Sequence, residues 1–549
     1  MTSFSSINRT SIIHQMSKTS FDLIVIGGGI TGAGIALDAT ARGMKVALIE
    51  MQDFAAGTSG RSTKLIHGGL RYLKQLEFKL VMEVGRERKI VHHNAPHLTQ
   101  PQPMLLPIVR GGSFNMFSAR IGIGIYELLA GVNAKERHNV LNKKETIAFE
   151  PLLRKDILKG GIVYNEYHTD DARLTLEVLK EAVSRGALAV NYTKATSILY
   201  QNKKICGVKI QDQIAGDEYE IYAANVVNAA GPWVDQLNSL DAPQAQSRLH
   251  ITKGVHIVID GKRFPVSQSV YFDTPDKRMI FVIPREGKTF IGTTDTFYSG
   301  DLANPTVTAE ERDYLLRCAN NFFPDCHLIP SDVESCWAGL RPLVNKPGKG
   351  PSEISRKDEM FESLSGLISI AGGKLTGYRK MAERVVDLIS NRYLKNNQRK
   401  FARCSTENLI LSGGIADGIK YFNKFVEEKT ATGVSLGLTA AETGLLIHRY
   451  GSGIDRLFDL IQKAGLSKDD TLPLALQAQL KYAVEEEMCT SPADFFVRRT
   501  SMLYFDIDNV IRWGKATLSF MNQMMNWNNE QKTNHENELQ QLISAAKNL

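Results

Sequence analysis

The sequence predicts an α/β fold: a Rossmann-like dinucleotide-binding domain carrying an antiparallel β substrate-cap lobe, followed by an all-α C-terminal domain. Three observations predict it. A strand–glycine–helix–strand unit stands near the start of the chain. Strand-like segments alternate with turns from 249 to 293. Apolar residues recur at helical spacing beyond 440. The length of 549 residues is enough for about two to four domains.

The dinucleotide unit occupies residues 22–50. Its first strand, 23–26, is apolar and mostly β-branched, which is typical of a buried parallel strand. A helix over about 30–42 follows a glycine-rich turn, and its free N–H groups and dipole favour a bound phosphate. A second strand, 46–49, completes the unit. The unit predicts a dinucleotide site but does not separate NAD from FAD.

Four residues of this unit have separate expected roles. Gly27 permits the tight turn out of the strand, Gly29 lets the backbone approach a pyrophosphate, and Gly32 lets the helix pack on the sheet. Glu50 ends the second strand about 20 residues later, where a carboxylate can bind a ribose hydroxyl pair. A glycine-rich turn without a ligand is the alternative. The strand, the glycines, the helix, the second strand and the acidic residue all stand at the spacing of a dinucleotide site, which argues against that alternative.

The composition argues against a nucleic-acid-binding protein, a membrane-spanning protein and a metal site. The net charge of +7 is modest and diffuse, so nucleic acid is not expected as a partner. No run of about 18 apolar residues exists, so no membrane-spanning helix is expected. The longest apolar stretch, 121–132, is interrupted by Glu127; we expect a core helix, with a helix on a bilayer surface as the alternative. Six cysteines without CxxC spacing predict reduced thiols and no metal site.

The remaining elements follow from periodicity and turn residues. Helices are expected at 78–93, 114–130, 143–149 and 171–185, the last with Asp170 as N-cap. Strands are expected at 101–109, 160–167, 187–192, 205–210, 219–222, 250–259, 269–272, 279–283 and 289–291. Segments 225–234 and 367–379 each join a strand to small residues and are expected at the cofactor crevice. C-terminal helices are expected at 440–450, 454–464, 474–487 and 508–525.

These elements predict the domain organisation. Residues 1–20, rich in Ser and Thr, are expected to be a flexible N-terminal tail. The nucleotide-binding domain spans 21–395, with the interleaved substrate-cap lobe at about 95–150 and 245–345. A polar, basic linker at 396–405 leads to the helical domain at 406–549.

Eight separated motifs resemble those of one family. IGGGITGAGIALDATARG (26–43) and GGKLTGYRKMA (372–382) are similar to the two signatures of bacterial FAD-dependent, quinone-linked glycerol-3-phosphate dehydrogenases. Between them, in the family's order, stand STKLIHGGLRYL (62–73), TDDARL (169–174), NAAGPW (228–233), KGVHIV (253–258), FVIPREGKTFIGTTD (281–295) and GLRPL (339–343). The match covers roughly 21–391, and the helical tail also resembles the family's C-terminal domain.

The resemblance implies a FAD-binding domain of the glutathione reductase/D-amino-acid oxidase type. It implies oxidation of sn-glycerol 3-phosphate to dihydroxyacetone phosphate, with FAD reduced and a membrane quinone (menaquinone or ubiquinone) as acceptor. It also implies a homodimer, located in the cytoplasm and attached peripherally to the inner face of the cytoplasmic membrane. The C-terminal region has no D-x-D-x-D-G calcium loop, which favours the bacterial form.

Three alternatives stay open. The α-glycerophosphate oxidases use oxygen and make hydrogen peroxide; they share these motifs but usually carry an extra cap insert, for which this chain has no room. An amine oxidase of the same fold would not need so many cations. A flavin-binding structural or tRNA-modification partner without dehydrogenase activity is the third.

The implied substrate is a phosphate dianion with a secondary alcohol, so its site requires cations and a proton acceptor. Our candidates for substrate binding are Arg71 with Tyr72, Arg341, Arg356 and Lys374. Outside these motifs, each cation would more often be an exposed surface charge.

His67 and His256 are the candidate bases, since an unperturbed imidazole titrates near neutral pH; a hydrogen-bonded core histidine is the alternative for each. Arg341 stays protonated, so we expect it to stabilise a developing alkoxide. A helix starting at Leu375, beside Lys374, is expected to present N–H groups to the flavin. Asp170 and Asp171 are expected only to cap a helix. The predicted cofactor-binding residues are Gly27, Gly29, Gly32, Glu50, Thr58, Ser62, Lys64, Leu65, Ala230, Gly231, Gly372, Gly373, Lys374, Leu375 and Thr376.

Overall fold

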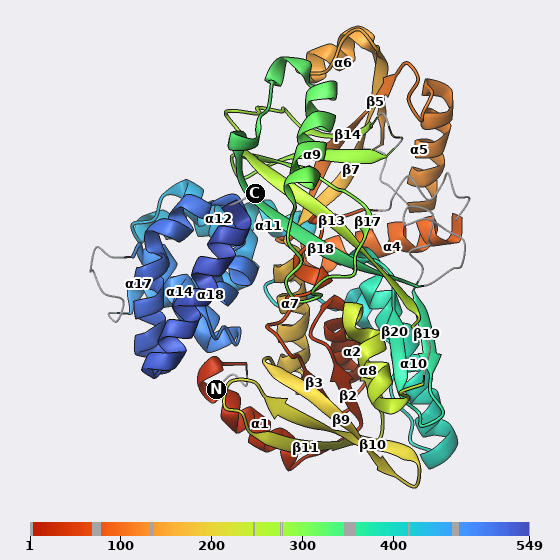
Figure 1. Ribbon diagram of the computed structural model, residues 1–549, viewed down its shortest axis with the longest axis vertical. Helices are drawn as coiled ribbons and strands as arrows, with labels where there is room; N and C mark the ends of the chain where they lie inside the picture. Colours follow the sequence, from red (N-terminus) through yellow and green to blue (C-terminus); the bar gives the residue numbers. More distant parts are fainter. Residues whose placement is uncertain are drawn as a thin grey trace.

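The computed structural model describes residues 4–67, 78–130, 137–244, 247–274, 276, 278–344, 358–415, 418–463 and 472–547. Figure 1 shows a nucleotide-binding region at the bottom, a cap lobe above it, and a group of C-terminal helices to the left. This arrangement confirms the predicted fold class: an α/β unit with a sheet-based cap and an all-α C-terminal region.

The nucleotide-binding region is built on a six-stranded sheet of order β19-β20-β12-β2-β3-β8. All neighbouring strands pair in parallel except the edge strand β19. Because β2 lies between β12 and β3, the strand order reverses there, and a crevice opens at the carboxyl ends. The strands are β2 (Leu23–Ile26), β3 (Val46–Ile49), β8 (Leu188–Val190), β12 (Val226–Asn228), β19 (Glu359–Glu362) and β20 (Ile368–Ala371).

Helices cover this sheet. α2 (Ile30–Ala41) contacts both α7 (Asp171–Ser184) and α10 (Tyr378–Asn397), and α8 (Val234–Asp241) contacts β12 and β20. Asp170 is the N-cap of α7, as predicted, and its carboxylate accepts a hydrogen bond from the Arg173 N–H at 3.0 Å. A four-stranded sheet of order β1-β11-β10-β9 stands beside it, with strands β1 (Ser20–Phe21), β9 (Thr193–Gln201), β10 (Lys204–Asp212) and β11 (Glu218–Ala223).

The cap is a ten-stranded sheet, and it is not wholly antiparallel as predicted, because β14 and β5 pair in parallel. It also takes in β7 and β4, which lie outside the predicted cap boundaries and join by antiparallel pairing to β5 and β7 respectively. Its strands are β4 (Leu65–Ile66), β5 (Thr99–Val109), β6 (Asn139–Asn142), β7 (Leu158–Thr169), β13 (Leu249–Asp260), β14 (Ser269–Asp273), β15 (Met279–Arg285), β16 (Lys288–Gly292), β17 (Thr296–Phe297) and β18 (Val333–Val344). Its helices are α4 (Phe78–Asn94), α5 (Met116–Ala130), α6 (Lys143–Phe149) and α9 (Ala309–Phe322).

The N-terminal segment differs from its prediction. Residues 4–17, expected to belong to a flexible tail, form η1 (Ser6–Asn8) and α1 (Arg9–Ser17). Ile12, Ile13 and Met16 are buried against the nucleotide-binding core. The Arg9 guanidinium also donates to Asp212 Oδ2 at 2.8 Å. The segment is therefore a packed helix, which its Ser- and Thr-rich composition did not predict.

The C-terminal helices share a hydrophobic core with the cap, where Phe496 and Leu503 belong to the same cluster as Trp337 and Phe290. Residues 398–405, within the predicted linker, have no helix or strand. The helices are α11 (Ile419–Ser435), α12 (Ala440–Tyr450), α13 (Ile454–Gln462), α14 (Leu474–Glu486), α15 (Pro492–Asp494), the π-helix η10 (Phe495–Arg499), α16 (Met502–Phe505), α17 (Ile507–Met525) and α18 (Asn529–Lys547). Short 3-10 turns are η2 (Thr58–Gly60), η4 (Gly231–Trp233), η5 (Pro324–Cys326), η6 (Pro330–Asp332), η7 (Leu375–Gly377), η8 (Thr406–Asn408) and η9 (Gly451–Gly453).

Among the described residues, no helix combines the length and hydropathy needed to cross a membrane. Within the same ranges, no group of three or more His, Cys, Asp or Glu side chains is placed to hold a metal ion. All six cysteines are free thiols.

Candidate active site

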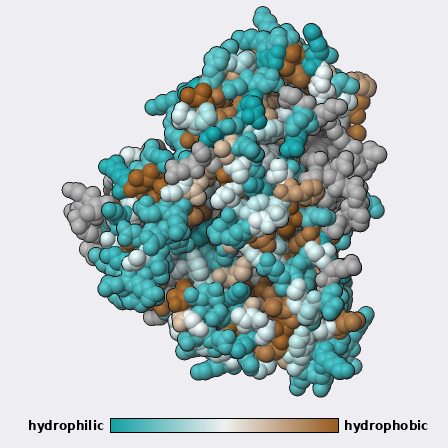
Figure 2. Space-filling model, in the orientation of Figure 1, coloured by the Kyte–Doolittle hydropathy of each residue, from teal (hydrophilic) through white to brown (hydrophobic). Residues whose placement is uncertain are grey.

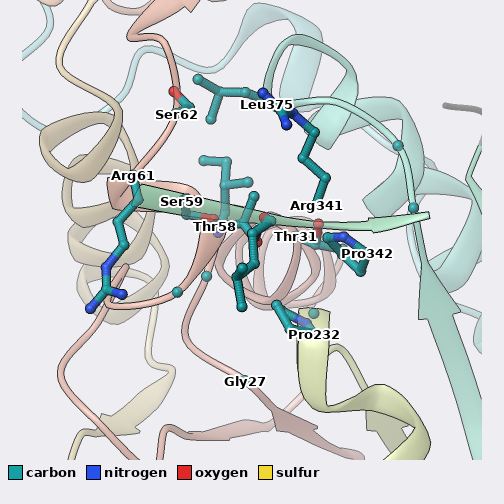
Figure 3. A pocket seen from close by; sticks show the side chains of 18 of the residues that line it. Gly27, Thr31, Thr58, Ser59, Arg61, Ser62, Pro232, Arg341, Pro342 and Leu375 are labelled. Carbon is teal, nitrogen blue, oxygen red and sulfur yellow. Dashed lines mark hydrogen bonds between the residues drawn. The ribbon is translucent and has the colours of Figure 1, made fainter. Parts of the chain in front are cut away.

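A cavity of about 610 Å³ lies where the carboxyl ends of β2, β12 and β20 face the cap strands β13 and β18. Figure 3 shows side chains from α2, η2, η4, η7 and β18 gathered around it. Most of the predicted site residues line it: Gly27, Gly29, Glu50, Thr58, Ser62, Leu65, His67, Ala230, Gly231, His256, Arg341, Gly372, Gly373, Lys374, Leu375 and Thr376. Segments far apart in the chain therefore meet at one site.

The first glycine turn is closely packed. Gly27 has φ of +117°, and a Cβ there would lie 2.5 Å from the Ala229 carbonyl oxygen. Gly32 does not line the cavity, but a Cβ there would lie only 1.9 Å from the Gly27 carbonyl oxygen. The helix and the turn can approach this closely only because both residues lack a side chain.

Glu50 contacts this turn from the neighbouring strand end. Its Oε2 accepts from the Gly28 N–H at 2.6 Å, and its Oε1 accepts from the Gln52 N–H at 2.8 Å. Burial raises the pKa of Glu50 above its usual value, although the backbone hydrogen bonds oppose this. The carboxylate thus holds the turn and also faces the cavity.

Arg341 lines the cap side of the cavity with a side chain that is 17% exposed. Its Nη2 donates to Thr293 Oγ1 at 3.0 Å, and its Nη1 lies 3.4 Å from Asp295 Oδ1. Gly254 on β13 leaves room for the guanidinium, because a Cβ there would lie 2.1 Å from Nη2. The side chain is therefore held in place on β18 as a cation at the cavity wall.

His256 is a buried imidazole on β13. Its ring stacks on Trp337 with centroids 4.5 Å apart, and its Nε2 lies 3.0 Å from Thr63 Oγ1. Within the described parts of the chain, Nδ1 has no hydrogen-bond partner. Burial, together with the charges of Arg341 and Lys64, holds the pKa of His256 well below its usual value, so the ring is neutral at pH 7.

His67 and Lys374 both line the cavity. The His67 ring meets Phe281 edge-on at 6.0 Å, and the His67 carbonyl oxygen accepts from Thr376 Oγ1 at 3.4 Å. Lys374 stands immediately before η7 and α10, so the helix predicted to start at Leu375 begins with a 3-10 turn.

The family model described as FAD dependent oxidoreductase matches residues 22–379 of this sequence. The chain belongs to the FAD-dependent oxidoreductase family. A second model, the C-terminal domain of alpha-glycerophosphate oxidase, matches residues 404–532. FAD is thus the cofactor, as predicted, and the fold is of the predicted FAD-binding type.

Relatives of this oxidoreductase extend over its whole length. It is 52% identical to aerobic glycerol-3-phosphate dehydrogenase of Bacillus subtilis over 547 residues, covering 99% of this chain and 98% of that protein. It is 50% identical to the protein of the same name from Staphylococcus aureus over 544 residues, covering 99% and 98%. The crystal structure of glycerol-3-phosphate dehydrogenase from Bacillus halodurans, complexed with FAD, superposes with a TM-score of 0.86 at 47% identity and covers 99% of both chains.

The cavity of this oxidoreductase fits FAD. Its volume of about 610 Å³ is within the usual range for cofactor sites. Two glycine turns line it, one at Gly27 and Gly29 and the other at Gly372 and Gly373, where the backbone has no side chain to cover it. Gly372 and Gly373 have φ of +78° and +80°. Gly27, Gly29 and Glu50 on one side, and Gly372 to Thr376 on the other, are the residues that would hold the cofactor.

Lys64 departs from its prediction as a residue lining the flavin side. Its fully buried Nζ binds Asp171 Oδ1 at 2.6 Å and Gly60 O at 3.3 Å, and the residue does not line the main cavity. A buried ammonium needs a carboxylate partner, and Asp171 is that partner. Asp171 also accepts from the Ser62 N–H at 2.8 Å, so it holds this loop in addition to lying at the start of α7.

Three predicted substrate residues, Arg71, Tyr72 and Arg356, lie outside the described residues. Conversely, Ser59, Arg61 and Thr293 line the cavity but were not predicted. Ser59 Oγ accepts from the Ile30 N–H at the start of α2 at 2.9 Å. Ser59 and Arg61 lie in the loop whose composition suggested a nearby ligand, but no motif separated them from their neighbours.

Gly32→Ala is expected to prevent FAD retention or folding, because its Cβ would lie 1.9 Å from the Gly27 carbonyl oxygen. The ratio of flavin to protein absorbance after purification measures this. Gly122→Ala is the control, since its Cβ would meet nothing within 4 Å. A G32A protein with full flavin content would contradict the close packing of this turn.

Proposed function

We propose that this oxidoreductase oxidises sn-glycerol 3-phosphate to dihydroxyacetone phosphate and passes the electrons to a membrane quinone. The observation that carries the proposal is its 52% identity to an aerobic glycerol-3-phosphate dehydrogenase over 99% of the chain. The cavity supports it, because Arg341 and Lys374 supply positive charge for a phosphate dianion and a developing alkoxide. Arg71, Tyr72 and Arg356 remain predicted substrate residues.

When bound, FAD supplies the acceptor for the hydride from C2 of the substrate. Arg341 keeps its proton and stabilises negative charge on the C2 oxygen as the hydroxyl proton leaves. Lys374 offers a point charge to the phosphate. The neutral ring of His256, held by Trp337 and Thr63, shapes the wall beside Arg341 without adding a charge.

Of the two candidate bases, we favour His67. The low pKa of His256 makes it a weak proton acceptor, and its Nε2 is already bonded to Thr63. His67→Asn is expected to lower kcat by about 10²–10⁴-fold, the usual contribution of general base catalysis, and to flatten the acid limb of the pH–rate profile. His256→Asn should leave that limb in place. If only H256N flattens it, His256 is the base.

The electron acceptor proposed here is a quinone, and the alternative acceptor is oxygen. The C-terminal family model carries the name of alpha-glycerophosphate oxidase, an enzyme that would pass electrons to oxygen. Adding glycerol 3-phosphate to the purified holoenzyme under nitrogen should bleach the flavin, and a soluble quinone should restore its colour. Failure to bleach would refute the dehydrogenase. Rapid recolouring by oxygen with stoichiometric hydrogen peroxide would identify the oxidase.

Helix α5 buries Ala119, Ile123 and Tyr126 in the core, as expected of a core helix, and we propose a membrane surface on its other face. Phe117, Ile121 and Ile125 are 76%, 46% and 37% exposed and, being four residues apart, share one helix face. Arg120 on the same helix and Arg110 in the segment before it are also exposed. Figure 2 shows hydrophobic side chains at the upper right edge, where α5 lies in Figure 1. Apolar residues flanked by cations favour an anionic bilayer surface, here the inner face of the cytoplasmic membrane.

A homodimer is also proposed, and analytical ultracentrifugation tests it.

The double variant Phe117→Ser, Ile121→Ser is expected to bind anionic vesicles at least ~10-fold more weakly, since burying each side chain contributes about 1.5–3 kcal/mol. Co-sedimentation with vesicles measures the bound fraction. Leu364→Ser, on a side chain that is 98% exposed elsewhere, is the matched control. Equal binding by both variants would place the membrane surface elsewhere.

A further inference from the structure

A second cavity, of about 270 Å³, lies between the cap sheet and helix α12 of the C-terminal region. Lys64 lines it, whereas the next residue, Leu65, lines the main cavity, so one segment separates the two. Its volume exceeds that of one water molecule, about 30 Å³, several times over. It can therefore hold a small polyatomic ligand.

His97 is the most buried imidazole of this second cavity, with 2% of its surface exposed. Neither ring nitrogen has a hydrogen-bond partner in the described parts of the chain. Gly413 and Gly451 pack against the ring, since a Cβ at either would come within 3 Å of it, so the ring has little room to turn. Burial lowers the pKa of His97 to about 3, and the neutral ring offers one donor and one acceptor.

Arg449 brings a positive charge to the same cavity. Its guanidinium donates to Gln479 Oε1 at 2.7 Å and to the Thr500 carbonyl oxygen at 2.9 Å, both neutral acceptors. It forms no ion pair with any described carboxylate, so its charge is not neutralised locally.

The other charges at the cavity wall are largely matched. Lys64 binds Asp171 at 2.6 Å, and Arg285 binds Glu286 at 3.1 Å. Asp170 caps α7 and lies 3.6 Å from Arg285, and Arg173 binds Glu487 at 2.6 Å. The charge left over is that of Arg449. The buried polar atoms without a partner on the lining residues are both ring nitrogens of His97, His168 Nδ1 and Arg173 Nε.

We propose that this cavity is an accessory binding site for a small phosphate-class anion. The anion's oxygens accept from Arg449 and from an imidazole N–H, and its own O–H donates to an unprotonated imidazole nitrogen. Buried polar atoms without a partner are unfavourable, and such a ligand would satisfy the groups that the protein leaves without one. The site does not depend on the function proposed for the main cavity.

Equilibrium dialysis of the FAD-loaded protein with radiolabelled inorganic phosphate, at constant ionic strength in chloride, tests this. Two variants remove the site by different means: Arg449→Gln removes the charge, and Leu445→Trp fills the cavity from a side chain that is 49% exposed. Ile511→Trp, on a side chain that is 48% exposed on α17, is the matched control. Arg341→Gln weakens any phosphate bound in the main cavity.

One saturable phosphate is expected to disappear in L445W and R449Q and to persist in I511W and R341Q. L445W decides the matter if R449Q fails to fold. No saturable phosphate in the wild type, or phosphate that L445W does not reduce, would overturn the proposal. Phosphate lost only in R341Q would instead belong to the main cavity, and the accessory site would be refuted while the proposed function stood.

Discussion

Arg341→Gln is expected to lower kcat/KM for glycerol 3-phosphate by about 10²–10³-fold, the usual effect of removing one donor aimed at a developing oxyanion. The glutamine is polar but carries no charge, so the alkoxide that forms at C2 loses the counter-ion that Arg341 supplies. Steady-state assays with an artificial electron acceptor measure the effect. Flavin content should be unchanged, because the guanidinium is held by cap residues rather than by the glycine turns.

Two comparisons make this result specific. Arg341→Lys keeps the charge but not the planar fork, so part of the activity should return. Arg154→Gln removes an exposed arginine of the cap region that is paired with Asp156, and turnover should stay at the wild-type level. If R341Q turned over substrate normally, Arg341 would have no part in the reaction.

Asp53→Ala is expected to lower the free energy of unfolding by about 3–5 kcal/mol, because it leaves buried guanidinium groups without their carboxylate. Asp53 Oδ2 accepts from Arg498 Nε at 2.5 Å and from Arg499 Nη1 at 2.7 Å, and Oδ1 accepts from Asn191 Nδ2 at 2.9 Å. This contact joins the loop after Glu50 to the π-helix of the C-terminal region. Urea unfolding followed by fluorescence measures it.

The same variant has a defined pH dependence. Burial opposes ionisation of Asp53, but the charges of Arg499 and Arg498 outweigh it and lower the pKa of the carboxyl group. Its stabilising contribution is therefore complete above the unfolded-state pKa of about 3.9 and is lost as the pH falls below it. The difference between wild type and D53A should shrink in acid. Asp156→Ala, on an exposed and solvent-screened pair, should leave stability close to that of the wild type at any pH. An equal loss in both variants would contradict the role of the buried contact.

Much of the nucleotide-binding region was predictable because its geometry is local. β2 and β3 begin and end at the predicted residues, and Asp170 caps α7 as expected. Strand, turn and helix signals there lie within about 30 residues, the span of one such unit. The cap was less predictable: the pairing of β7 with β5 joins segments that no local pattern links.

The site residues likewise fall into those that local sequence predicts and those whose contacts depend on distant segments. The glycines were identifiable because backbone conformation and close approach exclude every other side chain, as at Gly27 and Gly32. Lys64 stands among the predicted flavin-lining residues, yet its ammonium binds Asp171, 107 residues away. Composition also failed for α1, whose apolar side chains are buried by segments far along the chain.

Local pattern was thus sufficient for the glycine turns, the nucleotide-binding strands and the series of motifs that leads to Arg341. Long-range packing selected the partner of Lys64, buried the N-terminal helix, and brought His97 and Arg449 to one cavity. The physical reason is that turns and strand patterns follow from neighbouring residues, whereas burial and charge pairing depend on surfaces that exist only after the chain has folded.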